Sequence, residues 1–203
     1  MGQVHQKHYS KTAMALHWTS ALLLVGLLSV GAVMTRLPDH EFMLKFELYQ
    51  LHKSVGITLF VLVLLRLGWR LGHKPPALLL PVWQTRLAAI VHTALYALMI
   101  VMPLVGWAMV SASPLGIPTL LYDLVPLPHL AFFESLADKK TAEATLKQIH
   151  SALAGVLALL AGSHVVAALW HQFIQKDRLI HRMLPTRDPA DANAGTKSAA
   201  GGD

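Results

Sequence analysis

Four long apolar runs constrain the fold of this chain more than any other feature of its sequence. They cover about residues 12–34, 49–71, 87–110 and 149–173, and about 20 apolar residues suffice for an α-helix to cross a bilayer. Only 14% of the 203 residues are charged, whereas soluble domains have about 25%. Because backbone polar groups in lipid must be paired internally, we predict an all-α membrane protein built as a four-transmembrane-helix bundle.

Composition excludes several kinds of site. The chain has no cysteine, which rules out disulfides, iron–sulfur clusters, thiolate zinc sites and covalently attached c-type haem. The net charge of +6 is typical of basic cytoplasmic loops in a membrane protein, and we predict no nucleic-acid partner.

The distribution of Lys and Arg predicts the orientation of the chain. The connection after the second run and the segment after the fourth are basic and nearly free of acids, whereas the other two connections mix both signs. We therefore expect a multi-pass protein of the bacterial inner (cytoplasmic) membrane with both termini in the cytoplasm. Residues 1–185 form the membrane domain, with a longer, partly proline-rich outer connection at 111–148, and residues 186–203 form a disordered tail. The first run exceeds the length of a signal-peptide core, so we interpret it as a retained span.

The fourth run carries two histidines on one face. His164 follows His150 by 14 residues, close to four helical turns, which places them about 21 Å apart along the axis. One imidazole therefore lies near each leaflet of a bilayer whose hydrocarbon core is about 30 Å thick. This arrangement is what two haems stacked across the membrane need, if neighbouring helices supply the second ligands.

Histidines on two other runs match these depths. His52 lies at the outer start of the second run and pairs with His150, and His17 lies at the inner start of the first run and pairs with His164. Imidazoles on both faces of each iron give six-coordinate haems that transfer electrons without an open position for oxygen. The alternative for any one histidine is a hydrogen bond between helices.

Three further residues have more than one interpretation. His171 shares the face of His164 and is an alternative haem ligand, an interfacial histidine or a proton donor to a bound quinone. Arg66 lies near the depth of His164 and either contacts a haem propionate or a quinone carbonyl, or extends to the interface. His92 begins the third run on the same side and is a weaker candidate ligand; the other histidines are expected to be solvated.

Lys53 and Lys147 flank the two outer histidines. These cations would raise the local concentration of a small anion near the outer haem. Contact with phospholipid headgroups is the alternative role.

Several motifs in a fixed order carry a resemblance to a known family. They are Tyr9-Ser10, Leu16-His17-Trp18, Leu51-His52-Lys53-Ser54-Val55-Gly56, Leu65-Arg66-Leu67-Gly68-Trp69-Arg70, Val91-His92-Thr93-Ala94-Leu95-Tyr96, Pro103-Leu104-Val105-Gly106-Trp107, and Ile149-His150-Ser151 through His164 and His171. From about Tyr9 to Pro185 the sequence resembles the bacterial cytochrome b561 family of di-haem inner-membrane proteins. The resemblance implies two haem b groups with His17, His52, His150 and His164 as axial ligands, and electron exchange with the quinone pool.

The resemblance leaves more than one function open. One branch of the family oxidises periplasmic superoxide and reduces ubiquinone, which implies a quinone-coupled oxidoreductase with the position of His171 in the quinone site. The alternative is the cytochrome b electron-transfer subunit of a hydrogenase, dehydrogenase or reductase complex, reduced by a redox protein partner. A histidine-based metal transporter is a third class, but no carboxylate lies inside a span to serve a hard cation.

Overall fold

A computed structural model describes residues 8–73, 76, 80–177 and 179–184. Its four long helices are α1 (Lys11–Met34), α2 (Phe42–Gly72), α3 (Val82–Ser111) and α5 (Lys139–Trp170). All four are long and apolar enough to cross a membrane, which confirms the predicted class of four apolar helices. The predicted disordered tail lies outside the described residues.

Caps set the helix ends, and these lie beyond several of the predicted spans. Ser10 accepts a hydrogen bond from Ala13 N (3.2 Å) at the start of α1, and Asp138 accepts one from Thr141 N (3.1 Å) at the start of α5. The hydrogen bonds from Thr141 hold the pKa of Asp138 below its usual value. Hydropathy locates the part of a helix that lies in lipid, whereas capping oxygens determine where the helix begins. The α5 helix therefore starts at Lys139, well before the predicted span at 149.

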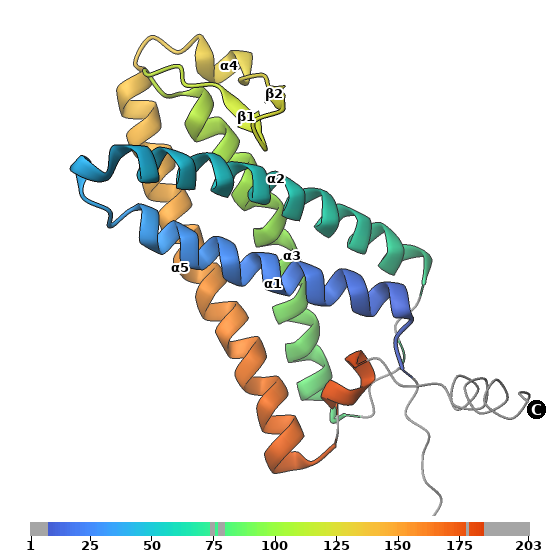
Figure 1. The fold of residues 1–203 in the computed structure, drawn as a ribbon. Coiled ribbons are helices and arrows are strands. Elements are labelled where there is room, and N and C mark those ends of the chain that lie inside the picture. Colours follow the sequence, from blue (N-terminus) through green and yellow to red (C-terminus); the bar gives the residue numbers. More distant parts are fainter. Residues whose placement is uncertain (1–7, 74–75, 77–79, 178, 185–203) are drawn as a thin grey trace, which may run out of the picture.

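The long helices form two hairpins that cross each other (Figure 1). Helix α1 packs against α2, α2 against α3, and α3 against α5. Their shared apolar core is a cluster of six side chains from all four helices: Leu24, Leu59, Val63, Leu95, Met99 and Leu157. Val63 is fully buried and Leu157 is 3% exposed, so this cluster is the centre of the bundle.

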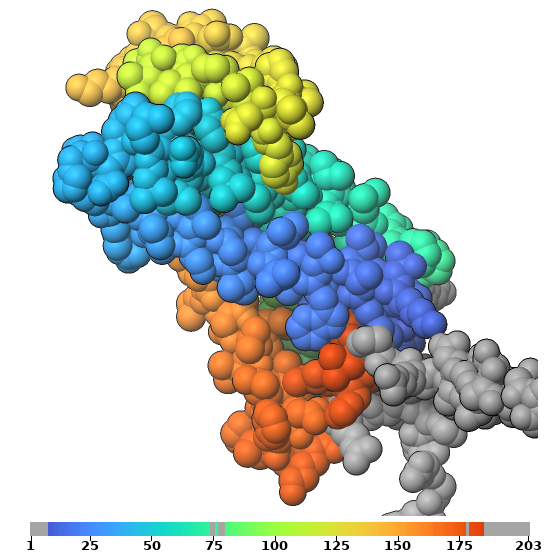
Figure 2. Space-filling view, in the orientation of Figure 1, coloured from blue at the N-terminus to red at the C-terminus, as the bar shows by residue number. Residues whose placement is uncertain are grey.

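A small cap covers one end of the bundle, called here the hairpin end (Figures 1 and 2). It contains the antiparallel strands β1 (Thr119–Leu121) and β2 (Val125–Leu127) and the short helix α4 (Ala131–Glu134), whereas the 3-10 turn η1 (Asp39–Glu41) connects α1 to α2. The turn between the strands places Tyr122 (φ 52°) and Asp123 (φ 59°) in the left-handed region. The sequence analysis did not predict this hairpin, because neither of the two turn residues is glycine.

The first and the last described segments of the chain meet at the opposite end, called here the terminal end. There α5 continues into the π-helical turn η2 (His171–Gln175), followed by the 3-10 turn η3 (Leu179–Met183). Tyr9 N donates to Arg182 O (3.1 Å), and Trp18 Nε1 donates to Met183 O (2.7 Å). These bonds fix the segment after α5 against the start of α1.

Candidate functional site

The structure brings the four predicted ligand histidines together in two pairs. The ring centroids of His17 and His164 are 6.4 Å apart near the terminal end, and those of His52 and His150 are 6.5 Å apart near the hairpin end. In each pair the ring planes are closer to perpendicular than to parallel, at 80° and 69°. The pairing is the one that matching by depth predicted.

The spacing of both pairs suits a metal ion between the rings. A metal–imidazole bond of about 2 Å on each side, with about 1.2 Å from nitrogen to ring centroid, separates two centroids by about 6.4 Å. The Nδ1 atoms of His17 and His52 are buried and, among the described residues, have no hydrogen-bond partner. Buried polar atoms without partners are rare in folded proteins, so these rings fit a ligand that the chain itself does not supply.

Each histidine pair joins helices that are not close neighbours. The long helices in extensive backbone contact are α1 with α2, α2 with α3 and α3 with α5. Instead, His17 of α1 faces His164 of α5, and His52 of α2 faces His150 of α5. The two pairs lie on opposite sides of the central core cluster, and each joins α5 to a helix that it does not pack against closely.

Glycines on neighbouring helices support the two rings at the hairpin end. A Cβ added to Gly106 of α3 would lie 3.3 Å from His150 Cε1, and one added to Gly31 of α1 would lie 3.4 Å from His52 Cε1. Both imidazoles therefore rest against bare backbone. The sequence analysis missed this role, since a glycine in an apolar helix is equally typical of ordinary helix packing.

We expect Gly106→Ala to perturb one histidine pair without unfolding the bundle. The added methyl group would press on a ring that cannot turn away once its nitrogen is bound to a metal, and such overpacking costs about 1–3 kcal/mol. Gly162→Ala is the matched control, because nothing lies within 4 Å of its added Cβ and the change gains about 0.5–1 kcal/mol of helix stability. The absorption spectrum and thermal stability of the purified holoprotein measure the effect. Identical behaviour of the two variants would contradict the packing argument.

His92 lies beside the pair at the terminal end. Its ring centroid is 5.2 Å from that of His164, which is shorter than two metal–imidazole bonds in line require. The other pair has no third histidine within ring contact among the described residues. His92 is therefore placed to contact the His164 ring from α3, and it is not equivalent to His17.

Arg66 occupies the predicted depth and is accompanied by a second arginine. The guanidinium carbons of Arg66 and Arg70 lie 5.3 Å and 5.8 Å from the centroid of the Tyr96 ring on α3. Arg66 is also within electrostatic range of His17 and His164. Neither the tyrosine nor the second arginine was predictable as a partner of Arg66 from the sequence, because the contact joins two different helices.

His171 makes a short contact with a carboxylate at the terminal end. Its Nδ1 is 2.5 Å from Asp177 Oδ2, and Asp177 Oδ1 accepts a hydrogen bond from Leu179 N (3.3 Å). The π-helical turn η2 and the left-handed Lys176 (φ 55°) bring the two side chains together. Single π turns in helices frequently occur at functional sites.

The two candidate steering lysines differ in their surroundings. Lys53 is half-buried, and its Nζ donates to Pro118 O (3.5 Å) below the cap, where Gln50 Nε2 donates to the same oxygen (3.2 Å). Lys147 is exposed. His129, predicted to be solvated, is half-buried in this cap, and its Nε2 is buried without a partner among the described residues.

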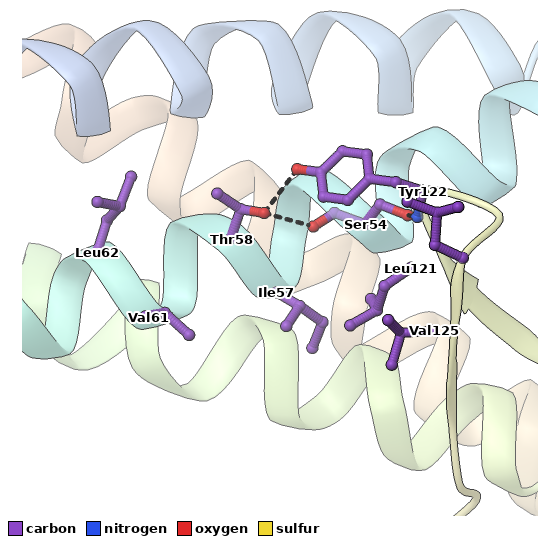
Figure 3. Close-up of a pocket in the computed structure, with 9 residues that line it drawn as sticks. Ser54, Ile57, Thr58, Val61, Leu62, Leu121, Tyr122 and Val125 are labelled. Carbon is purple, nitrogen blue, oxygen red and sulfur yellow. Dashed lines mark hydrogen bonds between the residues drawn. The ribbon is translucent and has the colours of Figure 1, made fainter.

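A groove of about 400 Å³ separates the hairpin from α2 (Figure 3). Its lining is almost entirely apolar, apart from Ser54, Thr58 and Tyr122. The hydroxyl groups of Thr58 and Tyr122 are hydrogen-bonded to each other (2.6 Å), and Tyr122 N donates to Ser54 Oγ (2.9 Å). None of the paired histidines lines this groove.

The fold and the histidine geometry together define a class: a bundle of four membrane-length helices with two imidazole pairs, one on either side of an apolar core, each spaced for a metal ion between the rings. Within that class, residues 8–186 match the family model of prokaryotic cytochrome b561, and the chain belongs to this family. Membership implies a haem b-containing electron-transfer protein of the membrane.

Curated relatives cover nearly the whole chain. Cytochrome b561 homolog 2 of Escherichia coli (strain K12) is 32% identical over 181 residues, 88% of this chain and 92% of that protein. Cytochrome b561 homolog 1 of the same organism is 28% identical over 183 residues, 88% of this chain and 98% of that protein. Probable superoxide oxidase CybB of Yersinia pestis is 30% identical over 186 residues, 89% of this chain and 98% of that protein.

Proposed function

We propose that this chain is a di-haem b cytochrome that transfers electrons across the inner membrane to the quinone pool. The observation that carries the proposal is the pair of ring separations, 6.4 Å and 6.5 Å, at two levels of one bundle. His17 and His164 would hold the inner haem, and His52 and His150 the outer one. The haems would supply one-electron chemistry, and two bound imidazoles leave the iron no open position for oxygen.

The chain's own residues would orient and separate the two haems. Gly31 and Gly106 let the outer imidazoles approach backbone, and the central core cluster keeps water out of the space between the two levels. The basic terminal end would face the cytoplasm, as the distribution of Lys and Arg favours. There the His171–Asp177 pair would hold a proton for a quinone, because a carboxylate oxygen accepts from Nδ1 and thereby fixes the tautomer of the ring.

Superoxide is our proposed electron donor at the hairpin end, and ubiquinone our proposed acceptor at the terminal end. The support is the relative named as a probable superoxide oxidase and the two lysines near His52 and His150. A small anion would be attracted by these cations and would pass its electron to the protein without binding iron.

A cytochrome b subunit of a larger redox complex is the second candidate function. The observation that favours it is exposed apolar surface on the cap, where Leu115, Leu124 and Phe132 are 76%, 82% and 71% exposed. A redox protein docking on this surface would then replace superoxide as the electron donor.

Stopped-flow reduction of the oxidised protein by superoxide distinguishes the two functions. For a superoxide oxidase we expect rapid reduction that slows with added salt, because salt screens the attraction to the lysines. Reversing both charges in Lys53→Glu with Lys147→Glu should lower the rate about tenfold or more at low ionic strength. Arg86→Glu, at the other end of the bundle, is the control and should leave this rate unchanged. Slow reduction that is indifferent to salt would contradict the superoxide proposal.

A further inference from the structure

Two arginines of α2 share one aromatic ring of α3. Arg66 and Arg70 are one turn apart on α2, and both lie over Tyr96 of α3 at 5.3 Å and 5.8 Å. Arg66 is half-buried, whereas Arg70 is exposed toward the terminal end. The face of the ring attracts both cations, but a cation–π contact contributes only about 0.5–2 kcal/mol.

No anion of the described chain neutralises this pair. The ion pairs of the described residues include His40 with Glu41, Lys45 with Asp39 and His171 with Asp177, and none of these includes Arg66 or Arg70. A charged side chain within a membrane-spanning helix is costly unless it is paired. The half-buried guanidinium of Arg66, which has no carboxylate partner among the described residues, therefore favours an anionic ligand, and the exposed Arg70 lies beside it.

The position of the pair identifies the chemical class of that ligand. Arg66 is within electrostatic range of His17, His92 and His164, which are the imidazoles at the terminal end. A haem b held by His17 and His164 would carry two propionate carboxylates, as many as there are guanidinium groups in this pair. Planar guanidinium groups bind carboxylates through two parallel hydrogen bonds, which a lysine cannot reproduce.

We propose that Arg66 and Arg70, held apart and oriented by Tyr96, form a carboxylate clamp for the propionates of the inner haem. This inference rests on the proposed function, because it requires a haem at the His17–His164 pair. It assigns Arg66 to the haem and leaves the quinone to the His171–Asp177 pair. The outer haem makes no use of this clamp.

Spectroscopy of the purified holoprotein tests the clamp without measuring activity. In Arg66→Gln and Arg70→Gln we expect the propionate bending band of one haem in resonance Raman spectra to shift. The midpoint potential of the same haem should fall, because a nearby cation favours the reduced form. Arg66→Lys should retain most of the potential but not the Raman band, since it keeps the charge and loses the bidentate hydrogen bonds. Arg86→Gln, an exposed arginine of α3, is the matched control.

Other outcomes distinguish a failure of the clamp from a failure of the proposed function. Unchanged Raman bands in both glutamine variants and in their double variant would overturn the clamp. A Raman shift confined to the outer haem, which is the haem that His52→Ala removes, would also overturn the clamp. A loss of quinone affinity with unchanged haem spectra would overturn it as well. If Arg66→Gln does not fold, Arg66→Lys gives the same Raman test. A wild-type protein with fewer than two haems would instead contradict the proposed function.

Discussion

His52→Ala and His150→Ala should each reduce the haem content of the purified protein from two per chain to one. Either change would leave a haem iron with one imidazole instead of two, since the ring centroids of this pair are 6.5 Å apart. The haem at the other level should remain, because the central core cluster of Leu59, Val63 and Leu157 separates the two levels. The pyridine haemochrome assay per polypeptide and the reduced α-band measure the loss.

The pairing itself is tested by combining the variants. His52→Ala with His150→Ala should lose no more haem than either single change, whereas His52→Ala with His164→Ala should lose both haems. His40→Ala is the control, because this loop side chain is 78% exposed. Loss of both haems in a single variant, or of neither, would refute the pairing. Absence of any b-type α-band in the wild-type protein would remove both haem-based functions.

Asp177→Asn and His171→Gln should lower the rate of quinone reduction about 100-fold or more, the usual contribution of a positioned general acid. Quinone takes up two protons with two electrons, and Asp177 is the sole carboxylate in the described part of the terminal end. Asparagine preserves the shape of the Asp177 side chain but cannot carry a proton. The measurement is steady-state quinol formation with a chemical reductant, compared with the rate of haem reduction in the same variant.

Two controls separate proton delivery from structural damage. Haem reduction should stay at the wild-type rate, and small weak acids in the buffer should restore quinol formation in Asp177→Asn. Asp123→Asn is the matched carboxylate-to-amide change at the hairpin end, where asparagine tolerates the left-handed backbone. Full quinone reduction in Asp177→Asn would exclude the role of the dyad, and a defect that weak acids do not relieve would make Asp177 structural.

The bundle was predictable because hydropathy and the bilayer thickness act on each run of sequence separately. The histidine pairs could be matched in advance for a related reason: helical rise converts residue number into depth, so His52 and His150 had to lie at one level. The cap was not predictable, since Tyr122 and Asp123 adopt positive φ through contacts that α2 supplies, including the bond from Tyr122 N to Ser54 Oγ.

By itself, then, the sequence determined the four spans, the family and the set of histidines able to face one another, because helical periodicity and lipid solubility are properties of a single segment. Only the tertiary structure decided which backbone supports each ring, which aromatic ring two arginines share and which carboxylate meets His171. Those contacts join different elements or depend on the π turn at the end of α5. They depend on the angles at which the helices cross and on where each helix ends, and the periodicity of a single segment does not determine either of these.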